Sequence, residues 1–238
     1  TSELPILAIP TTLAGSEMTP IYGITEGGQK KTGRDVRVLP KTVIYDPLLT
    51  MTLPAKIAGP SGMNAIAHCV EALYAQEANP ITSLMAEEGI RTLASSLPVV
   101  VSQPDNLDAR TEALYGAWLA GSCLGSVGMA IHHKLCHTVG GTDNLPHAET
   151  HTIILPHATR YNRNAAPEAM MRYAVPDAWH DIGVRRWGFH GASHKFIAER
   201  SAQLLGRDDV ARRVQNLYVD RGQSPVRKPD CRVISCHL

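Results

Sequence analysis

The sequence predicts a mainly α-helical protein, a helical bundle with a short N-terminal β hairpin and a small α/β C-terminal tail. Two observations carry this prediction. Alanine-rich segments with apolar residues at helical spacing, such as Ile66, Val70 and Leu73, begin near Leu53. β-Rich runs are confined to the first 50 or so residues. With 238 residues, 44% of them hydrophobic, the chain is large enough to bury a substantial core.

Residues 1–52 form the β-rich region. The runs LPILAIPTT and RVLPKTVIYDP are rich in strand-forming residues, and the polar segment EGGQKKTGRD separates them. Gly27, Gly28 and Gly33 in this segment are typical of a turn. We therefore expect the two runs to pair as a hairpin or to form two strands.

Residues 53–172 form the helical region. Helical texture runs through residues 54–76, 83–101 and 108–139, and Pro80, Pro98, Pro104 and the Gly-containing segments are expected to divide the helices. Proline is expected to end a helix because it lacks the backbone N–H that the helical hydrogen-bond pattern needs.

Residues 173–238 differ in charge from the rest. Residues 1–172 carry 12 Lys and Arg against 15 Asp and Glu, whereas residues 173–238 carry 11 against 7. The shift suggests a domain boundary near residue 172. Beyond it we expect a helix over about residues 193–205 and an apolar strand over 231–238, which ends at the last residue as if the chain were cut there.

Composition excludes several classes of protein. A net charge of +1 argues against a nucleic-acid partner, and no long apolar run indicates a membrane span or a secretion signal. Five cysteines without a CxxC pair argue against a disulfide framework, so we expect reduced and mostly buried thiols. A cytoplasmic protein that acts on a small molecule is the resulting expectation.

Histidines at helical spacing are the residues most suited to chemistry. Asn64 and His68 lie four residues apart, as do His133 and His137, and His147 follows a glycine-rich turn. Residues four apart share one helix face, so the five side chains can converge on one polar pocket. Imidazole is a common ligand of zinc and suits ferrous iron, which makes the pocket a candidate for metal or proton chemistry. The alternative is that these histidines are ordinary core or surface residues.

Four motifs resemble the iron-containing alcohol dehydrogenase family, and most closely its maleylacetate reductase branch. They are PTTLAGSEMTPIYGITE, SGMNAIAHCVEALYA, LYGAWLAG and HHKLCHTVGGTDNLPHAETHTIILPH, within about residues 4–169. The resemblance implies a divalent metal, Fe or Zn, held by Asn64, His68, His133 and His147. Asn64 takes the place of the family's aspartate, as is typical of the reductase branch, whose members are generally regarded as working without bound iron.

The resemblance also implies an NAD(P)H-dependent reaction. His137 matches a histidine beside the nicotinamide that is associated with proton transfer, and His133 joins it as a catalytic candidate. Thr11, Thr12 and Ser16 match a cofactor-contacting segment, which without the family would read as a polar turn. The family's Gly-rich phosphate turn is not present in this sequence, so residues 1–52 are expected to be a remnant of the nucleotide-binding domain.

The tail resembles a second family, acetate kinase, over about residues 173–238. Its motif FHGASH is close to that family's FHGTSH signature and contains His190 and His194. Two family fragments in one chain suggest a fusion. Other parts of the kinase site fall outside the segment. The favoured role of the two histidines is therefore to cap a helix or to lie on its surface.

Three functions are weighed. The first is a reductase of the maleylacetate type, with His137 as proton donor. The second is a metal-dependent hydrolase, in which an ion at His68, His133 and His147 activates water. The third is a non-catalytic truncated fusion that self-associates through exposed apolar surface. A homo-oligomer is expected.

Overall fold

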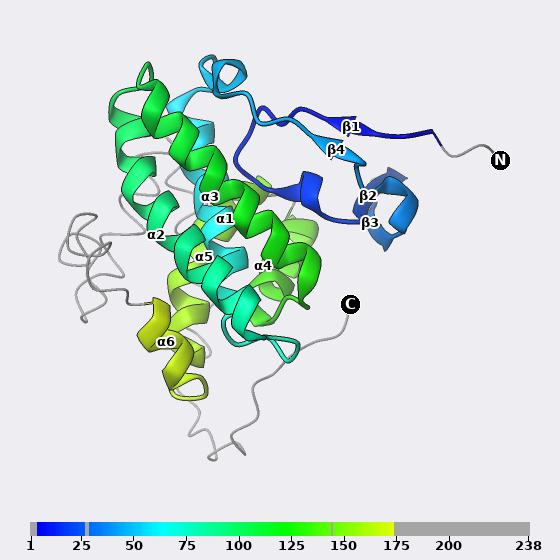
Figure 1. The fold of residues 1–238 in the computed structure, drawn as a ribbon. Helices are drawn as coiled ribbons and strands as arrows, with labels where there is room; N and C mark the ends of the chain where they lie inside the picture. The colour runs from blue at the N-terminus through cyan, green and yellow to red at the C-terminus, as the bar shows by residue number, and fades with distance from the viewer. Residues whose placement is uncertain (1–3, 27–28, 144, 174–238) are drawn as a thin grey trace.

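The computed structural model describes residues 4–26, 29–143 and 145–173, and a helical bundle forms most of this described part (Figure 1). The helices confirm the mainly α fold class. They are α1 (Ala55–Ala72), α2 (Pro80–Ser102), α3 (Leu107–Ser126), α4 (Ile131–Asp143), α5 (His147–Asn162) and α6 (Pro167–Tyr173). The expected helix at 193–205, the strand at 231–238, the histidines at 190 and 194 and the last two cysteines lie outside the described residues.

The strands of the N-terminal region pair differently from the expectation. The two apolar runs contribute β1 (Leu7–Ala8) and β4 (Thr42–Val43), which pair in parallel rather than as a hairpin. The hairpin lies between them, where β2 (Ile21–Glu26) pairs antiparallel with β3 (Gln29–Arg34). The polar segment expected as a turn is thus itself largely a strand, because residues 29–34 of it form β3.

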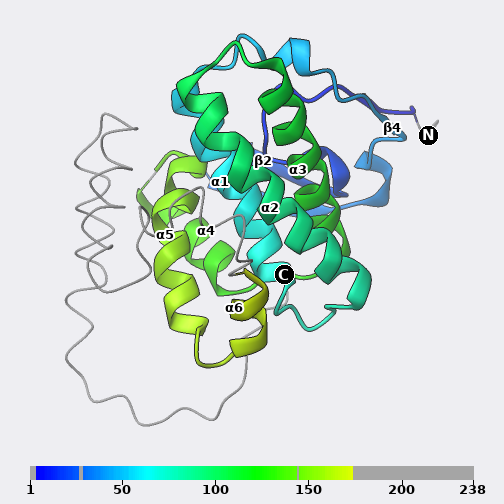
Figure 2. The same cartoon turned by 60° about the vertical axis from the view of Figure 1, so that its left-hand side comes forward.

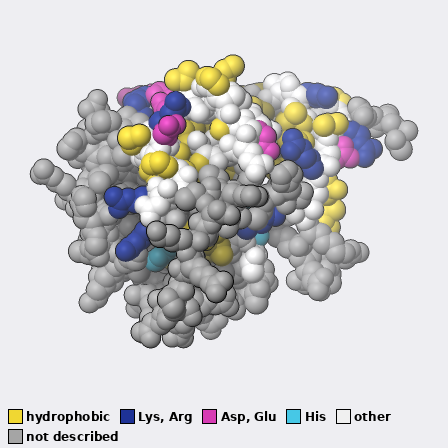
Figure 3. All heavy atoms as spheres, turned by 90° about the horizontal axis from the view of Figure 1, so that it is seen from below, with side chains coloured by type: hydrophobic (Ala, Val, Ile, Leu, Met, Phe, Trp, Pro, Cys, Tyr) yellow, Lys and Arg dark blue, Asp and Glu magenta, His cyan; other side chains and the backbone are white. Residues whose placement is uncertain are grey.

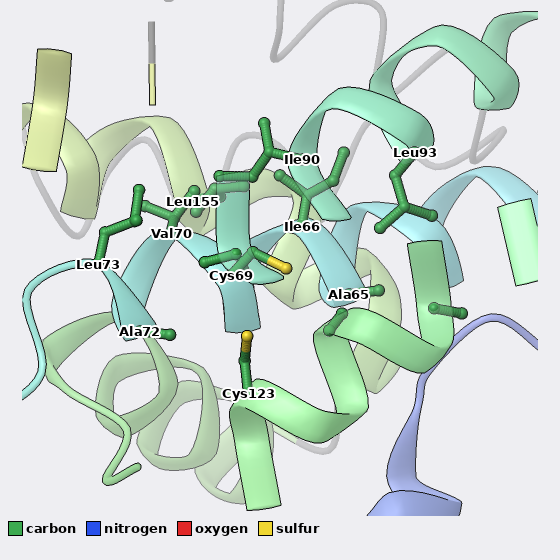
Figure 4. Packing of buried hydrophobic residues seen from close by; sticks show 14 of the residues in the cluster. Ala65, Ile66, Cys69, Val70, Ala72, Leu73, Ile90, Leu93, Cys123 and Leu155 are labelled. Atoms are coloured by element: carbon green, nitrogen blue, oxygen red, sulfur yellow. The ribbon is translucent and has the colours of Figure 1, made fainter. Parts of the chain in front are cut away.

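The central helix of the bundle is α1, which packs against α2, α3 and α5 (Figure 2). Every residue from Asn64 to Ala72 is buried, so this part of the helix has no solvent-facing side. Its apolar side chains interlock with Ile90 and Leu93 of α2 and Leu155 of α5 in one continuous core (Figure 4). A polar side chain on this stretch of α1 must therefore find its partner inside the protein.

Capping residues explain where the helices begin. Asn79 accepts hydrogen bonds from the N–H groups of Ile81 and Thr82, and the Thr82 hydroxyl accepts from the Asn79 N–H, a reciprocal capping box. Pro80 then occupies the first helical position, where a missing N–H costs nothing. Asn106 caps α3 by accepting a hydrogen bond from the Ala109 N–H, without the reciprocal bond.

Pro98 does not divide two helices, and the expectation that it would is wrong. It lies inside α2, which continues to Ser102. The neighbours Leu97 and Val100 are buried in the core, and their packing holds the segment helical despite the lost backbone hydrogen bond. Pro80 and Pro104 do lie at helix boundaries, as expected.

The segment between β1 and the helices is anchored to the bundle at two points. The N–H of the buried Leu13 donates to Ser61 Oγ of α1 at 2.9 Å. Gly15 has a φ of 76°, and a Cβ there would lie 2.7 Å from the Ala117 carbonyl oxygen of α3. Only glycine fits this close approach, so the chain that carries Thr11, Thr12 and Ser16 is held against the bundle.

The cysteines that the structure describes are free and buried, which agrees with the expected thiols: Cys69, Cys123 and Cys136. In Figure 4, Cys69 of α1 and Cys123 of α3 lie within the apolar core. Among the described residues, no single helix is long and apolar enough to cross a membrane; α3 and residues 131–138 of α4 meet that criterion only as a pair bent by 93°.

Arg110 of α3 is 2% exposed, and it ties this helix to the segment that leads into α1. Its guanidinium donates to the carbonyl oxygens of Thr50, Leu53 and Pro104. We expect Arg110→Met to lower the free energy of unfolding by about 2–4 kcal/mol, because it leaves buried carbonyls without donors. Urea denaturation measures this change, and the exposed Arg91→Met of α2 serves as the control with an expected change below about 1 kcal/mol.

Candidate active site

Three helices bring the polar residues of the site together. Asn64, His68 and Glu71 share one face of α1, and all three are buried. The other members lie on α4 and α5, two helices that pack against each other: His132, His133, His137, His147 and His151. We call these eight residues the histidine cluster.

The imidazole rings form a continuous series. The His68 and His133 rings stack with centroids 4.8 Å apart, and the His133 and His151 centroids are 4.6 Å apart. His147 lies 4.2 Å from His151 and 5.9 Å from His137, again between centroids. The structure thus places His68, His133, His137 and His147 in one site, and Asn64 is on the buried face of α1, one turn before His68.

The cluster is buried at one end and exposed at the other. His68, His132, His133 and His151 are buried, whereas His137 and His147 are exposed. Histidine side chains also reach the surface in the view from below (Figure 3). A small molecule or ion can therefore approach the cluster from the side of His137 and His147.

Glu71 was not among the residues expected from the sequence, and it organises the buried end. Its Oε2 accepts from His133 Nδ1 at 2.6 Å, and its Oε1 accepts from the His132 backbone N–H at 2.8 Å. In the neutral tautomer with the proton on His133 Nδ1, the Nε2 atom carries an unshared electron pair. The sequence did carry a signal, since Asn64, His68 and Glu71 follow helical spacing on one face.

His132 and His151 were also missed. The His132 Nε2 lies 3.0 Å from the His151 carbonyl oxygen, which links α4 to α5. His151 lies four residues after His147, and this repeats the spacing that had singled out the other pairs. The structure adds it to the cluster because α5 directs both histidines at α4.

Burial keeps the inner histidines neutral. It lowers the pKa of His132 to about 4, with the neighbouring His133 adding to the effect and Glu71 opposing it. Burial, then His137 and His147, lowers the pKa of His133 to about 3. The pKa values of His68 and His151 are lowered in the same way, first by burial. Burial conversely raises the pKa of Glu71. Neutral imidazoles offer lone pairs for a proton or a metal.

Among the residues that the structure describes, several buried polar atoms of the cluster have no hydrogen-bond partner. They include Asn64 Oδ1, His68 Nδ1, His133 Nε2 and both ring nitrogens of His151. Buried polar groups are normally satisfied, so a group of unsatisfied donors and acceptors in one place fits a site for a metal or a polar ligand. The donor set thus fits a divalent metal, although the uncharged Asn64 is a weaker ligand than a carboxylate.

The predicted cofactor contacts lie on the anchored segment. Thr11 and Thr12 are exposed, and Ser16 is exposed at the start of a short 3-10 helix (Ser16–Met18) that packs against α3. All three residues therefore lie at the surface of the described part of the chain.

The fold and the cluster define the class of protein. The chain belongs to the iron-containing alcohol dehydrogenase family, whose C-terminal family model matches residues 59–177. Its relatives include the maleylacetate reductase of Pseudomonas sp. (strain P51), 66% identical over 168 residues, or 71% of this chain and 48% of that protein. The maleylacetate reductase of Pseudomonas knackmussii is 60% identical over 94% of this chain and 70% of its own length.

A solved structure from the same family has a similar fold. The crystal structure of maleylacetate reductase from Rhizobium sp. strain MTP-10005 has a TM-score of 0.72 and 45% identity, and the match covers 87% of this chain and 56% of that one. This chain spans about half the length of several curated relatives that it matches. The relatives support the oxidoreductase interpretation and give no support to the hydrolase alternative.

Two of the comparisons extend beyond residue 172 into the C-terminal tail. A model of the acetokinase family matches residues 140–224 and so overlaps the first match. The P. knackmussii alignment covers 94% of the chain and therefore also extends beyond residue 172. The fusion of two families stays a prediction.

Proposed function

We propose that this chain carries the active pocket of a reductase that uses NAD(P)H to reduce a carbon–carbon double bond or a carbonyl group of a small substrate, with maleylacetate as the substrate to test first. The observation that carries the proposal is the convergence of histidines from α1, α4 and α5 in one cluster, in which His137 and His147 are exposed. Family membership and the names of the relatives support it.

His137 acts as the proton donor in this proposal. Reduction by a nicotinamide delivers a hydride to one substrate atom, and a proton must reach the other reacting atom. His137 is exposed, so it can recover its proton from solvent, and its centroid lies 6.2 Å from that of the buried His133. His133, held by Glu71, presents Nε2 to the pocket and orients the substrate.

The cofactor assignments are part of the proposal. Thr11, Thr12 and Ser16 contact the nicotinamide cofactor. His68, His133, His147 and Asn64 would hold a divalent metal, Fe or Zn, which when bound would polarise a substrate oxygen. A small-molecule substrate and a homo-oligomeric state complete the prediction.

The direct test measures NADH and NADPH oxidation by the full chain. We expect oxidation that depends on maleylacetate and saturates with it, together with cofactor binding in a fluorescence titration. The proposal fails if neither cofactor binds and neither is oxidised in the presence of maleylacetate.

Asn64 limits the affinity with which the family's metal position can bind an ion. We expect Asn64→Asp to raise the affinity for Zn²⁺ at this position at least about tenfold, because a carboxylate adds a charged ligand beside His68. Competition with a chelator measures the affinity. Combining the change with His68→Asn removes the gain if the ion is bound there, and an undiminished gain would contradict the assignment.

A further inference from the structure

Two glycines of α3 form the surface on which residues 11–19, here called the docked segment, lie (Figure 1). Gly121 and Gly125 are four residues apart and therefore share one face of the helix. A Cβ atom at Gly121 would overlap the Gly15 carbonyl oxygen, and one at Gly125 would lie 2.6 Å from the Met18 carbonyl oxygen. The backbone of the docked segment thus rests directly on the backbone of α3, and a larger residue at either position would push the two apart.

A side-chain hydrogen bond holds the docked segment from another element. The Tyr45 hydroxyl donates to Glu17 Oε1 at 2.8 Å, and the two residues are 28 positions apart in the sequence. Burial, and then the hydrogen bond to Glu17, raises the pKa of the Tyr45 hydroxyl, so this group stays protonated and remains a donor near neutral pH. Tyr45 follows β4, which pairs with β1 just before the docked segment.

The docked segment is also closed on itself at its end. Thr19 is buried, its hydroxyl donates to the Ser16 carbonyl oxygen, and the same hydroxyl accepts from the Ile21 N–H. Together with the hydrogen bond from the Leu13 N–H to Ser61, these contacts fix the backbone on both sides of Ser16. The residues assigned to the cofactor are exposed on a backbone whose course is set before any ligand binds.

We propose that the glycine pair of α3 and the Tyr45–Glu17 hydrogen bond position the docked segment for NAD(P)H. A ligand that meets a segment already in place does not have to order it, so less of the binding free energy is lost. The inference rests on the proposed function, because that function assigns the cofactor contacts to this segment. Gly121, Gly125 and Tyr45 are positioning residues, so their loss should raise the Kd and the KM for the cofactor and leave kcat nearly unchanged.

The first test replaces Gly121 by alanine in the full chain. Gly121→Ala should displace the docked segment and raise the Kd for NADH at least about tenfold in a fluorescence titration, because NADH must then order the segment. At saturating NADH, kcat with maleylacetate should change by less than about threefold. Gly59→Ala of α1 is the matched control: a Cβ there would lie 3.5 Å from Val101 Cγ2, which is an ordinary contact. The control should change Kd and kcat by less than about twofold.

A second pair of variants guards against misfolding of Gly121→Ala. Tyr45→Phe keeps the ring and removes only the donor, so it should raise the Kd for NADH about threefold to tenfold. Glu17→Gln keeps an acceptor oxygen for the Tyr45 hydroxyl and should stay within about twofold of the unchanged chain. Glu17→Ala should match Tyr45→Phe, and combining the two should add nothing further, because both remove the same hydrogen bond.

Hydrogen exchange without cofactor shows whether the docked segment has moved. The N–H groups of Met18 and Thr19 donate to the Gly15 and Ser16 carbonyl oxygens, and they should exchange faster in Gly121→Ala, while those of α2 should not. Faster exchange with an unchanged Kd for NADH overturns the inference alone, as does unchanged exchange or a fall in kcat as large as the rise in Kd. If the unchanged chain binds neither NADH nor NADPH, the proposed function fails and the inference fails with it.

Discussion

The metal-free protein should lose stability steeply as the pH falls from about 7 to about 5. His132 and His133 have folded-state pKa values of about 4 and 3, and the pKa values of His68 and His151 are lowered as well. In the unfolded chain they return to about 6.5, so below that pH the unfolded state binds more protons than the folded one. Stability is therefore present above pH 6.5 and is lost as the pH falls.

The expected size of this effect is large. Each histidine that stays neutral in the folded state costs about 1.4 kcal/mol per pH unit once the pH is well below 6.5, until its folded pKa is reached. Several such groups together approach the whole stability of a small domain, about 5–15 kcal/mol. Glu71 acts in the opposite direction, since its raised pKa favours the folded state at low pH, but it is one group against four.

Urea unfolding at several pH values, in the presence of a chelator, measures the slope. We expect His151→Asn to make the dependence shallower, because one buried histidine is removed. A free energy of unfolding that stays constant between about pH 7 and pH 5 would show that the inner histidines are hydrated and not buried.

His137→Gln should lower reductase turnover by about 10²–10⁴-fold, the usual contribution of a general acid. Glutamine keeps a polar side chain of similar reach at the exposed site, but it cannot donate a proton readily. Because the residue is exposed on α4, the fold should be unchanged. Steady-state NADH oxidation with maleylacetate gives kcat and KM, and the loss should be mainly in kcat.

The control for this variant is Thr138→Ala. Thr138 is the next residue on α4, it is exposed, and its hydroxyl donates to the Lys134 carbonyl oxygen. Its loss should change turnover by less than about twofold. Equal losses in the two variants would point to damage to α4 instead of the removal of a proton donor.

Much of the bundle could be predicted because local rules and packing agree there. Residues with helical spacing, together with Pro80 and Pro104 at the boundaries, predict the helical segments of α1 to α3. Pro98 misled the prediction because the burial of its neighbours outweighs the local cost of proline. The N-terminal strands were harder, since the pairing of β1 with β4 depends on a contact across about 35 residues.

The candidate site was predictable in part for a similar reason. Spacing of four residues pointed to His68, His133 and His137, because a helix places such residues on one face. Glu71 and His151 could not be ranked from spacing alone. Their importance comes from being buried beside other helices, a property that only the packing of α1, α4 and α5 reveals.

The claim that the histidine cluster is the substrate pocket can be tested by NMR of the imidazole rings in the full chain. Titration with maleylacetate in the presence of chelator should shift the ring resonances of His133, His137 and His147 with one saturating dependence. Succinate, a saturated dicarboxylate, serves as the comparison. Ring resonances that remain unmoved at saturating maleylacetate would contradict the account.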